Sequence, residues 1–154
     1  MTSDTTLPRT ALWLGLAGLI PFVWGALTTV APALGDSARE VIGPRMVGPY
    51  VQLFYGMVIL SFMSGVLWGF AARAPHDKAG WAYGVSVIPA LWAFFMTGGG
   101  PYAAGLALIA GFLGLLALDW VYWRAGLAPP WWMTLRVMLT VVVVVCLGIG
   151  VVLA

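Results

Sequence analysis

Charge is what this sequence has least of. Only 8% of its 154 residues are charged, whereas soluble domains carry roughly 25%. Hydrophobic residues make up 62% of the chain, and the mean hydropathy is +1.01. These values exclude an ordinary soluble domain and indicate a membrane protein. The formal net charge of +2 is small and scattered, so the chain has no footprint for nucleic acid and none is expected as a partner.

Cysteine and histidine are nearly absent as well. The single cysteine, Cys146, lies in an apolar run, so one chain cannot form an internal disulfide. The single histidine, His76, lies in a polar stretch that we expect to be a loop. One chain with this inventory cannot supply two axial histidines to a haem or a His/Cys set to zinc. We therefore expect no cofactor and no metal site.

Apolar runs, by contrast, are plentiful, and five of them are long enough to cross a bilayer. The sequence predicts an all-α polytopic membrane protein, a compact bundle of five transmembrane helices in one domain. The first run is longer than the apolar region of a usual signal peptide, so we expect it to be retained. Pro21 and Pro89 each remove a backbone N–H inside a run and predict kinks. The expected spans are residues 10–30, 50–72, 81–97, 102–122 and 131–154.

The longest expected loop, residues 34–49, contains a candidate surface helix. Ser37 and Glu40 have the spacing of a capping box, which begins a helix, and Gly43-Pro44 would end it. We expect this helix to lie on the membrane surface with its charges in water.

Small residues recur at helical spacing in two of the runs. In lipid such stripes let another helix approach closely, because hydrophobicity gives little drive for association there. Both faces are therefore predicted to be packed, against a neighbour that the sequence does not identify. The second run contains Ser61, Gly65 and Gly69, and the fourth contains Ala103, Ala107, Ala110, Gly114 and Ala117.

Two opposite charges flank the turn between the last two runs. Asp119 lies about eight or nine residues before the centre of this turn, and Arg136 lies about as many after it. Equal distance from the turn of a helical hairpin means equal depth in the bilayer, so the two side chains are predicted to pair. Pro129 and Pro130 suit the turn. The pair is either a structural clamp near the interface or the core of a ligand, proton or substrate site.

Aromatic residues gather around the same turn. The simplest interpretation is a belt at the membrane interface, and the alternative is a cage that stacks on a ligand. The residues are Trp120, Tyr122, Trp123, Trp131 and Trp132.

Basic residues predict the orientation of the bundle. With five spans, one side carries five basic residues and the other carries two, which places the amino terminus inside. The five are Arg9, Arg73, Lys78, Arg124 and Arg136, and the two are Arg39 and Arg45.

Three segments together resemble a known family. They are residues 18–22 (GLIPF), residues 55–69 (YGMVILSFMSGVLWG), and residues 118–140 across the hairpin. In this order they resemble an uncharacterised bacterial inner-membrane family, a domain-of-unknown-function family that also includes the mitochondrial transmembrane protein 69. The resemblance implies a compact five-helix protein of the bacterial inner membrane and no established reaction, cofactor or substrate. The family more often has glycine where Ser64 stands and histidine where Leu67 stands, which argues against a metal or proton role at that position.

Three classes of function are compatible with these features. The favoured one is a non-enzymatic accessory, assembly or scaffold protein that packs against other membrane proteins in a larger complex, or against a second copy of itself. The alternative is a small carrier, channel or lipid-handling protein with a site at Asp119 and Arg136. An intramembrane enzyme is disfavoured, because only Ser61, Ser64 and Tyr55 are available to work with Asp119.

Overall fold

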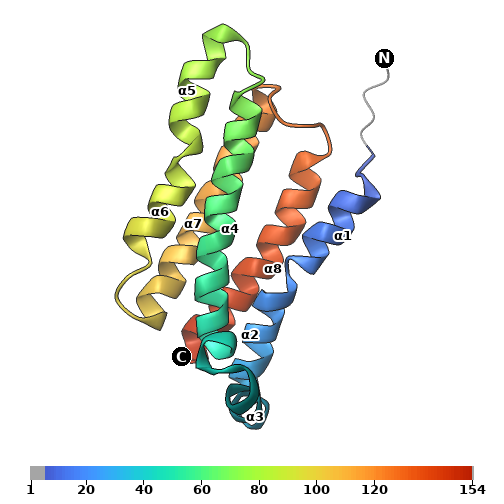
Figure 1. Cartoon of the computed structure of the whole chain (residues 1–154). Coiled ribbons are helices and arrows are strands. Elements are labelled where there is room, and N and C mark those ends of the chain that lie inside the picture. Colours follow the sequence, from blue (N-terminus) through green and yellow to red (C-terminus); the bar gives the residue numbers. More distant parts are fainter. Residues whose placement is uncertain (1–5, 154) are drawn as a thin grey trace.

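Five helical segments of the computed structural model are long and apolar enough to cross a membrane, which confirms the predicted all-α bundle. The structure describes residues 6–153. The first span begins at one end of the bundle and the last span finishes at the other (Figure 1). The segments are Arg9–Val30, Gly48–Ala71, His76–Met96, Pro101–Arg124 and Trp132–Leu153.

Helix α4 (Gly48–Ala71) is the central element of the bundle. It packs against α2, α5, α6, α7 and α8, and Figure 1 shows it crossing in front of the other spans. Its buried face includes Leu60 and Leu67, neither of which has any exposed surface. The last two spans, α7 (Pro101–Arg124) and α8 (Trp132–Leu153), form an antiparallel hairpin beside it.

The first span is broken where Pro21 predicts a kink. Helix α1 (Arg9–Ala17) ends before Gly18, and α2 (Ile20–Val30) begins after Leu19 with Pro21 in its first turn. Proline is tolerated there because the N–H groups of a first turn have no partner within their helix. Helix α2 packs against α4 and α8, whereas α1 contacts mainly α8 and leans away from the bundle (Figure 1).

The third span is broken in the same way by Pro89. Helix α5 (His76–Ser86) is followed by α6 (Ile88–Met96), which carries Pro89 in its first turn. The first N–H groups of a helix have no hydrogen-bond partner within that helix. In α6 one of them is bonded by a neighbouring span, because the Ser64 hydroxyl of α4 accepts a hydrogen bond of 2.9 Å from the Ala90 N–H. The expectation that His76 lies in a loop is wrong, because His76 is the first residue of α5.

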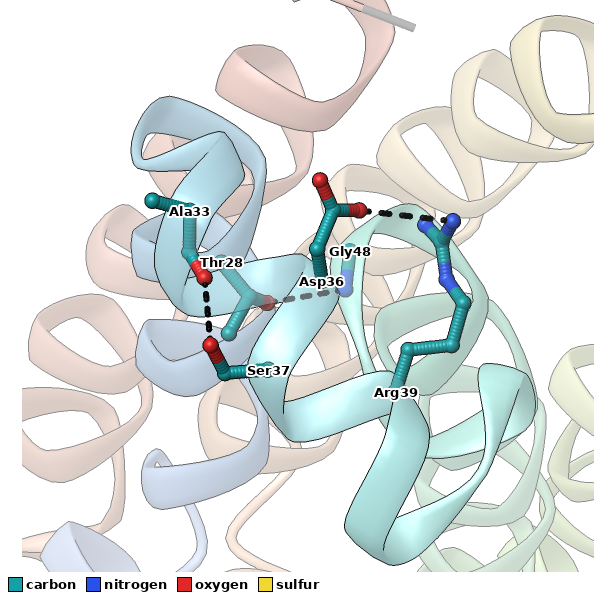
Figure 2. A network of polar contacts seen from close by, with 6 residues as sticks. All are labelled: Thr28, Ala33, Asp36, Ser37, Arg39 and Gly48. Carbon is teal, nitrogen blue, oxygen red and sulfur yellow. Dashed lines mark hydrogen bonds and ion pairs between the residues drawn. The ribbon is translucent and has the colours of Figure 1, made fainter.

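The predicted surface helix exists, but it begins earlier than the capping box implied. Helix α3 (Pro32–Ile42) starts at Pro32, and a short 3-10 helix, η1 (Pro44–Met46), follows it. Ser37 lies in the middle of α3 and donates a hydrogen bond of 2.9 Å to the Ala33 carbonyl (Figure 2). A proline after Ala31 was the stronger start signal, because proline fits the first turn of a helix. The exposed Asp36 and Arg39 form an ion pair at 3.6 Å.

Polar side chains from the spans fix the end of the bundle near α3. The buried Thr28 hydroxyl of α2 accepts a hydrogen bond of 2.8 Å from the Gly48 N–H, which begins α4 (Figure 2). One turn further along α4, the Gln52 amide nitrogen donates to the carbonyls of Phe22 and Cys146, both at 2.9 Å. Gln52 is fully buried and joins α2, α4 and α8, a role that sequence reasoning missed.

The two predicted small-residue stripes do not pack within the chain. Gly65 and Gly69 are exposed, and a Cβ atom added at either would meet no heavy atom within 4 Å. Ser61 is exposed beside them, and four of the five residues in the second stripe are exposed as well. The close approaches are elsewhere: a Cβ at Gly25 would lie 2.4 Å from Gln52 Cγ, and one at Gly111 would lie 2.8 Å from Trp92 Cδ1.

Candidate functional site

The hairpin between α7 and α8 holds the two predicted charges at matching depth. Helix α7 ends in a Schellman motif: Leu127 N–H donates to the Tyr122 carbonyl at 2.9 Å and Gly126 N–H donates to the Trp123 carbonyl at 3.0 Å. Gly126 has φ of +76°, a left-handed conformation that glycine adopts without strain. The Lys78 ammonium donates to the Ala125 carbonyl at 3.1 Å, which ties the start of α5 to this turn.

Asp119 and Arg136 meet across the hairpin. Arg136 Nε donates to Asp119 Oδ2 at 2.6 Å, and the exposed fractions of the two side chains are 7% and 0%. The distance is at the short limit for a charge-assisted hydrogen bond between a guanidinium nitrogen and a carboxylate oxygen. The pair is thus enclosed by protein rather than exposed at the bundle surface.

Trp132 completes the environment of the carboxylate, and sequence reasoning did not assign it this role. Its indole Nε1 donates to Asp119 Oδ1 at 2.8 Å. Its ring packs edge-on against Phe70 of α4, with the ring centres 5.1 Å apart. Both oxygens of Asp119 therefore have a donor. Asp119 and Trp132 are 13 residues apart across the turn, and this spacing could have suggested the contact. The sequence analysis assigned Trp132 to an aromatic belt instead.

The belt interpretation is compatible with the placement of some of the aromatic residues and not with that of others. Trp120 and Trp123 are exposed, as expected of side chains at a membrane interface. Tyr122 is fully buried, and its hydroxyl donates to the Ala82 carbonyl of α5. Its ring packs against Trp81 with centres 5.4 Å apart. Tyr122 is therefore a core residue that joins α7 to α5.

Two buried polar atoms on α8 have no hydrogen-bond partner among the described residues. They are Arg136 Nη2 and Thr140 Oγ1. Both residues line a hollow of about 620 Å³ that is bordered by α1, α2, α4, α7 and α8. Apart from these two residues, Tyr55 and the indoles of Trp131 and Trp132, the lining is apolar and includes Leu139 and Phe22.

The other residues considered for chemistry lie away from the carboxylate or are already engaged. Ser61 donates to the Met57 carbonyl of its own helix, and Ser64 accepts from Ala90. His76 is exposed at the start of α5, and Cys146 is buried in α8. Within residues 6–153, no group of three or more His, Cys, Asp or Glu side chains is arranged to hold a metal ion. The arrangement can therefore hold a neutralised ion pair beside a largely apolar hollow.

Comparison with known proteins agrees with the resemblance drawn from the sequence. Residues 7–152 match the family described as "Protein of unknown function (DUF3429)". The chain is 37% identical over 141 residues to transmembrane protein 69 of Xenopus tropicalis, covering 89% of this chain and 51% of that protein. It is 32% identical over 139 residues to the protein of the same name in Mus musculus, covering 88% and 52%. The chain thus spans about half the length of these relatives. No solved structure matches the chain.

Proposed function

This chain belongs to the DUF3429 family, and we propose that it serves as a non-enzymatic accessory protein that packs against a helix of another membrane protein. Its five apolar helices and its transmembrane relatives make it a multi-pass membrane protein. We place it in the bacterial inner membrane with the amino terminus inside, which is the location that the family resemblance and the distribution of basic residues favour.

The uncovered stripe on α4 is the observation that carries this proposal. Ser61, Gly65 and Gly69 share one face of the central helix, and that face is exposed. The chain's own small-residue contacts use other glycines, such as Gly25 and Gly111. A small-residue face lets the backbone of a second helix approach closely, and close packing is a main source of helix association in lipid. The stripe therefore suits a transmembrane helix of a partner.

A non-enzymatic role is supported by the state of Asp119. General acid–base chemistry needs groups that converge on a place where a substrate fits. The Asp119 side chain is fully buried, and its two oxygens accept hydrogen bonds from Trp132 and Arg136. The two serine hydroxyls that were candidates to work with it bond to backbone groups elsewhere.

The test introduces bulk on the stripe without disturbing the fold. Gly65→Leu fills space that no described atom occupies, so stability in detergent should not fall. Copurification of a partner in mild detergent, followed by mass spectrometry, should be lost in Gly65→Leu. It should be kept in Gly84→Leu, a control at an exposed glycine of α5 that also has no neighbour within 4 Å. The complex should re-form from purified components.

Two results would contradict the proposal. A partner that binds Gly65→Leu and the unaltered protein equally well does not use the stripe. A stripe that crosslinks only to a second copy of this chain marks a homo-oligomer instead.

The second candidate function is a lipid-handling protein or carrier with its site at Asp119 and Arg136. One observation favours it specifically: Arg136, the partner of Asp119, is among the residues that line the hollow of about 620 Å³ beside α8.

A further inference from the structure

A second, smaller hollow lies on the outside of the bundle, between α2, η1 and α4. We call it the α2–α4 groove. It has a volume of about 330 Å³, and its lining includes Arg45 of η1, Pro21 of α2, and Phe54 and Val58 of α4. Arg45, Phe54 and Val58 are themselves exposed, so a molecule outside the protein can touch them.

The α2–α4 groove extends along one leaflet of the membrane. Arg45 lies just before α4, which begins at Gly48 at the end of the bundle that carries α3 (Figure 1). Val58 is about 15 Å further along the helix, and this is half of the roughly 30 Å thickness of the hydrocarbon core. Pro21 lies at a similar depth on α2, about 14 Å before that helix ends at Val30. The groove therefore runs from the headgroup level to the middle of the bilayer.

Arg45 places a cation at the headgroup end of the groove. Its guanidinium carbon lies 4.2 Å from the centre of the Phe54 ring, in the second turn of α4. Within residues 6–153 no carboxylate forms an ion pair with Arg45, and the nearby Asp36 is paired with Arg39. The planar fork of a guanidinium matches the oxygens of a phosphate, and lipid phosphates lie at this depth. Charge and depth therefore point to a lipid phosphate as the counter-ion.

The rest of the groove suits the acyl chain of the same molecule. Phe54 and Val58 are one helical turn apart, so they lie on one face of α4, and both are apolar and exposed. A phospholipid in this leaflet has its phosphate at the headgroup level and its chains directed toward the middle of the bilayer, which is the direction of the groove. A free phosphate ion would meet Arg45 and leave the apolar lining uncovered.

We propose that the α2–α4 groove binds one anionic phospholipid from the leaflet at the α3 end, with its phosphate on Arg45 and one acyl chain along Phe54 and Val58. The lipid is anionic because the ammonium of a zwitterionic headgroup would add a second cation near Arg45. This site goes beyond the accessory role proposed above. No residue of the α4 stripe lines the groove, so lipid binding and partner copurification are lost in different variants.

The experiment counts the lipids bound to the full chain by native mass spectrometry from detergent micelles. The probes are dioleoylphosphatidylglycerol, dioleoylphosphatidylcholine, dioleoylglycerol, which has the chains without the phosphate, and glycerophosphate, which has the phosphate without the chains. The fraction of protein that carries one lipid gives an apparent Kd at each added concentration. We expect phosphatidylglycerol to bind about tenfold more tightly than the other two lipids, the value of roughly one charge-assisted hydrogen bond. Glycerophosphate should not bind at concentrations that saturate the site with phosphatidylglycerol.

Matched variants assign the binding to the groove. Arg45→Gln should weaken the apparent Kd for phosphatidylglycerol about tenfold. Its control is Arg124→Gln, because Arg124 is also exposed and stacked on an aromatic ring but does not line the groove. Val58→Trp should fill the groove and abolish binding. Its control is Val141→Trp on α8, where the valine is 57% exposed against 60% for Val58 and lies outside the groove. Both controls should bind as the unaltered chain does, and all four variants should keep its thermal unfolding midpoint, because each changes an exposed side chain.

Three results would overturn the proposal. If phosphatidylglycerol binds no more tightly than phosphatidylcholine or dioleoylglycerol, Arg45 does not select an anionic phosphate. If Arg45→Gln and Arg124→Gln bind equally, the lipid is attracted by basic residues in general. If Val58→Trp and Val141→Trp bind equally, the acyl chain does not lie in the groove.

Discussion

Asp119 and Arg136 are tolerable inside the bundle only because each has the other. A single charge in a membrane interior is costly, and the cost is relieved when a counter-charge and hydrogen bonds are supplied. Arg136 and the Trp132 indole supply both to Asp119. Removing one partner leaves the other buried and uncompensated, which is worse than removing both.

A double-mutant cycle measures this coupling. Asp119→Asn and Arg136→Gln should each lower the free energy of unfolding in detergent by about 3–5 kcal/mol, the usual cost of breaking a buried pair. The double variant should lose less than the sum of the two, because it leaves no lone charge. Denaturant unfolding of the four proteins gives the coupling energy. Strict additivity would show that the two side chains do not stabilise each other.

Gln52 is the second residue whose single substitution should be severe. Its amide nitrogen donates to the carbonyls of Phe22 and Cys146 in the buried interior near the α3 end of the bundle. Gln52→Met keeps the length of the side chain and removes both hydrogen bonds, so we expect a loss of about 1–3 kcal/mol in denaturant unfolding. Ser61→Ala is the control, because that exposed hydroxyl bonds only within its own helix and its removal should have little effect. Equal effects would contradict the bridging role.

The sequence could predict the Asp119–Arg136 pair but not its surroundings, for a physical reason. Pairing follows from the equal sequence distance of the two residues from the turn, and that distance can be counted in the sequence. The contact of Trp132 with Asp119 and the bridging by Gln52 depend on the rotation of each helix about its axis, which is set by packing with the whole bundle. A lone glutamine in an apolar run was nevertheless a usable signal, since a polar group at that depth needs partners.

At the scale of helices, backbone chemistry proved easier to predict than packing. Pro21 and Pro89 break their spans because proline lacks the N–H that continues a helix, and this property is local. The Gly65–Gly69 spacing can also be seen in the sequence. The direction in which that helix face points cannot, because it depends on how α4 packs with the other spans. Both faces of α4 carry small residues, and the bundle covers the face with Gly56 rather than the one with Gly65.

Paired alanine substitutions test which glycines hold helices together. A Cβ at Gly25 would lie 2.4 Å from Gln52 Cγ and 2.8 Å from the Gly48 carbonyl, so Gly25→Ala must push α2 and α4 apart. We expect a loss of about 1–3 kcal/mol in the free energy of unfolding. Gly69→Ala, where a Cβ meets nothing within 4 Å, should be neutral or stabilising by up to about 1 kcal/mol. A tolerated Gly25→Ala would contradict the close contact between α2 and α4.

For the whole molecule, the structure changes the weight of the charges that predict orientation. Arg136 is buried against Asp119, so it cannot act as a free loop charge. The count of basic residues becomes four against two, and the bias keeps its sign. Helix α3 and the turn between α7 and α8 lie at opposite ends of the bundle (Figure 1). Labelling one position at each of these two ends therefore determines which end faces the cytoplasm.

Cysteine labelling in bacterial spheroplasts settles that choice. In a Cys146→Ala background, Ser37→Cys marks the α3 end and Asp77→Cys marks the end that carries the α7–α8 turn, and both positions are exposed. With the amino terminus inside, a membrane-impermeant maleimide should label Ser37→Cys in intact spheroplasts. It should label Asp77→Cys only after permeabilisation, because the excess of lysine and arginine holds that end in the cytoplasm. The reverse labelling pattern would mean that the amino terminus lies outside. Labelling of both positions from outside would contradict a bundle in which α4 crosses the membrane between them.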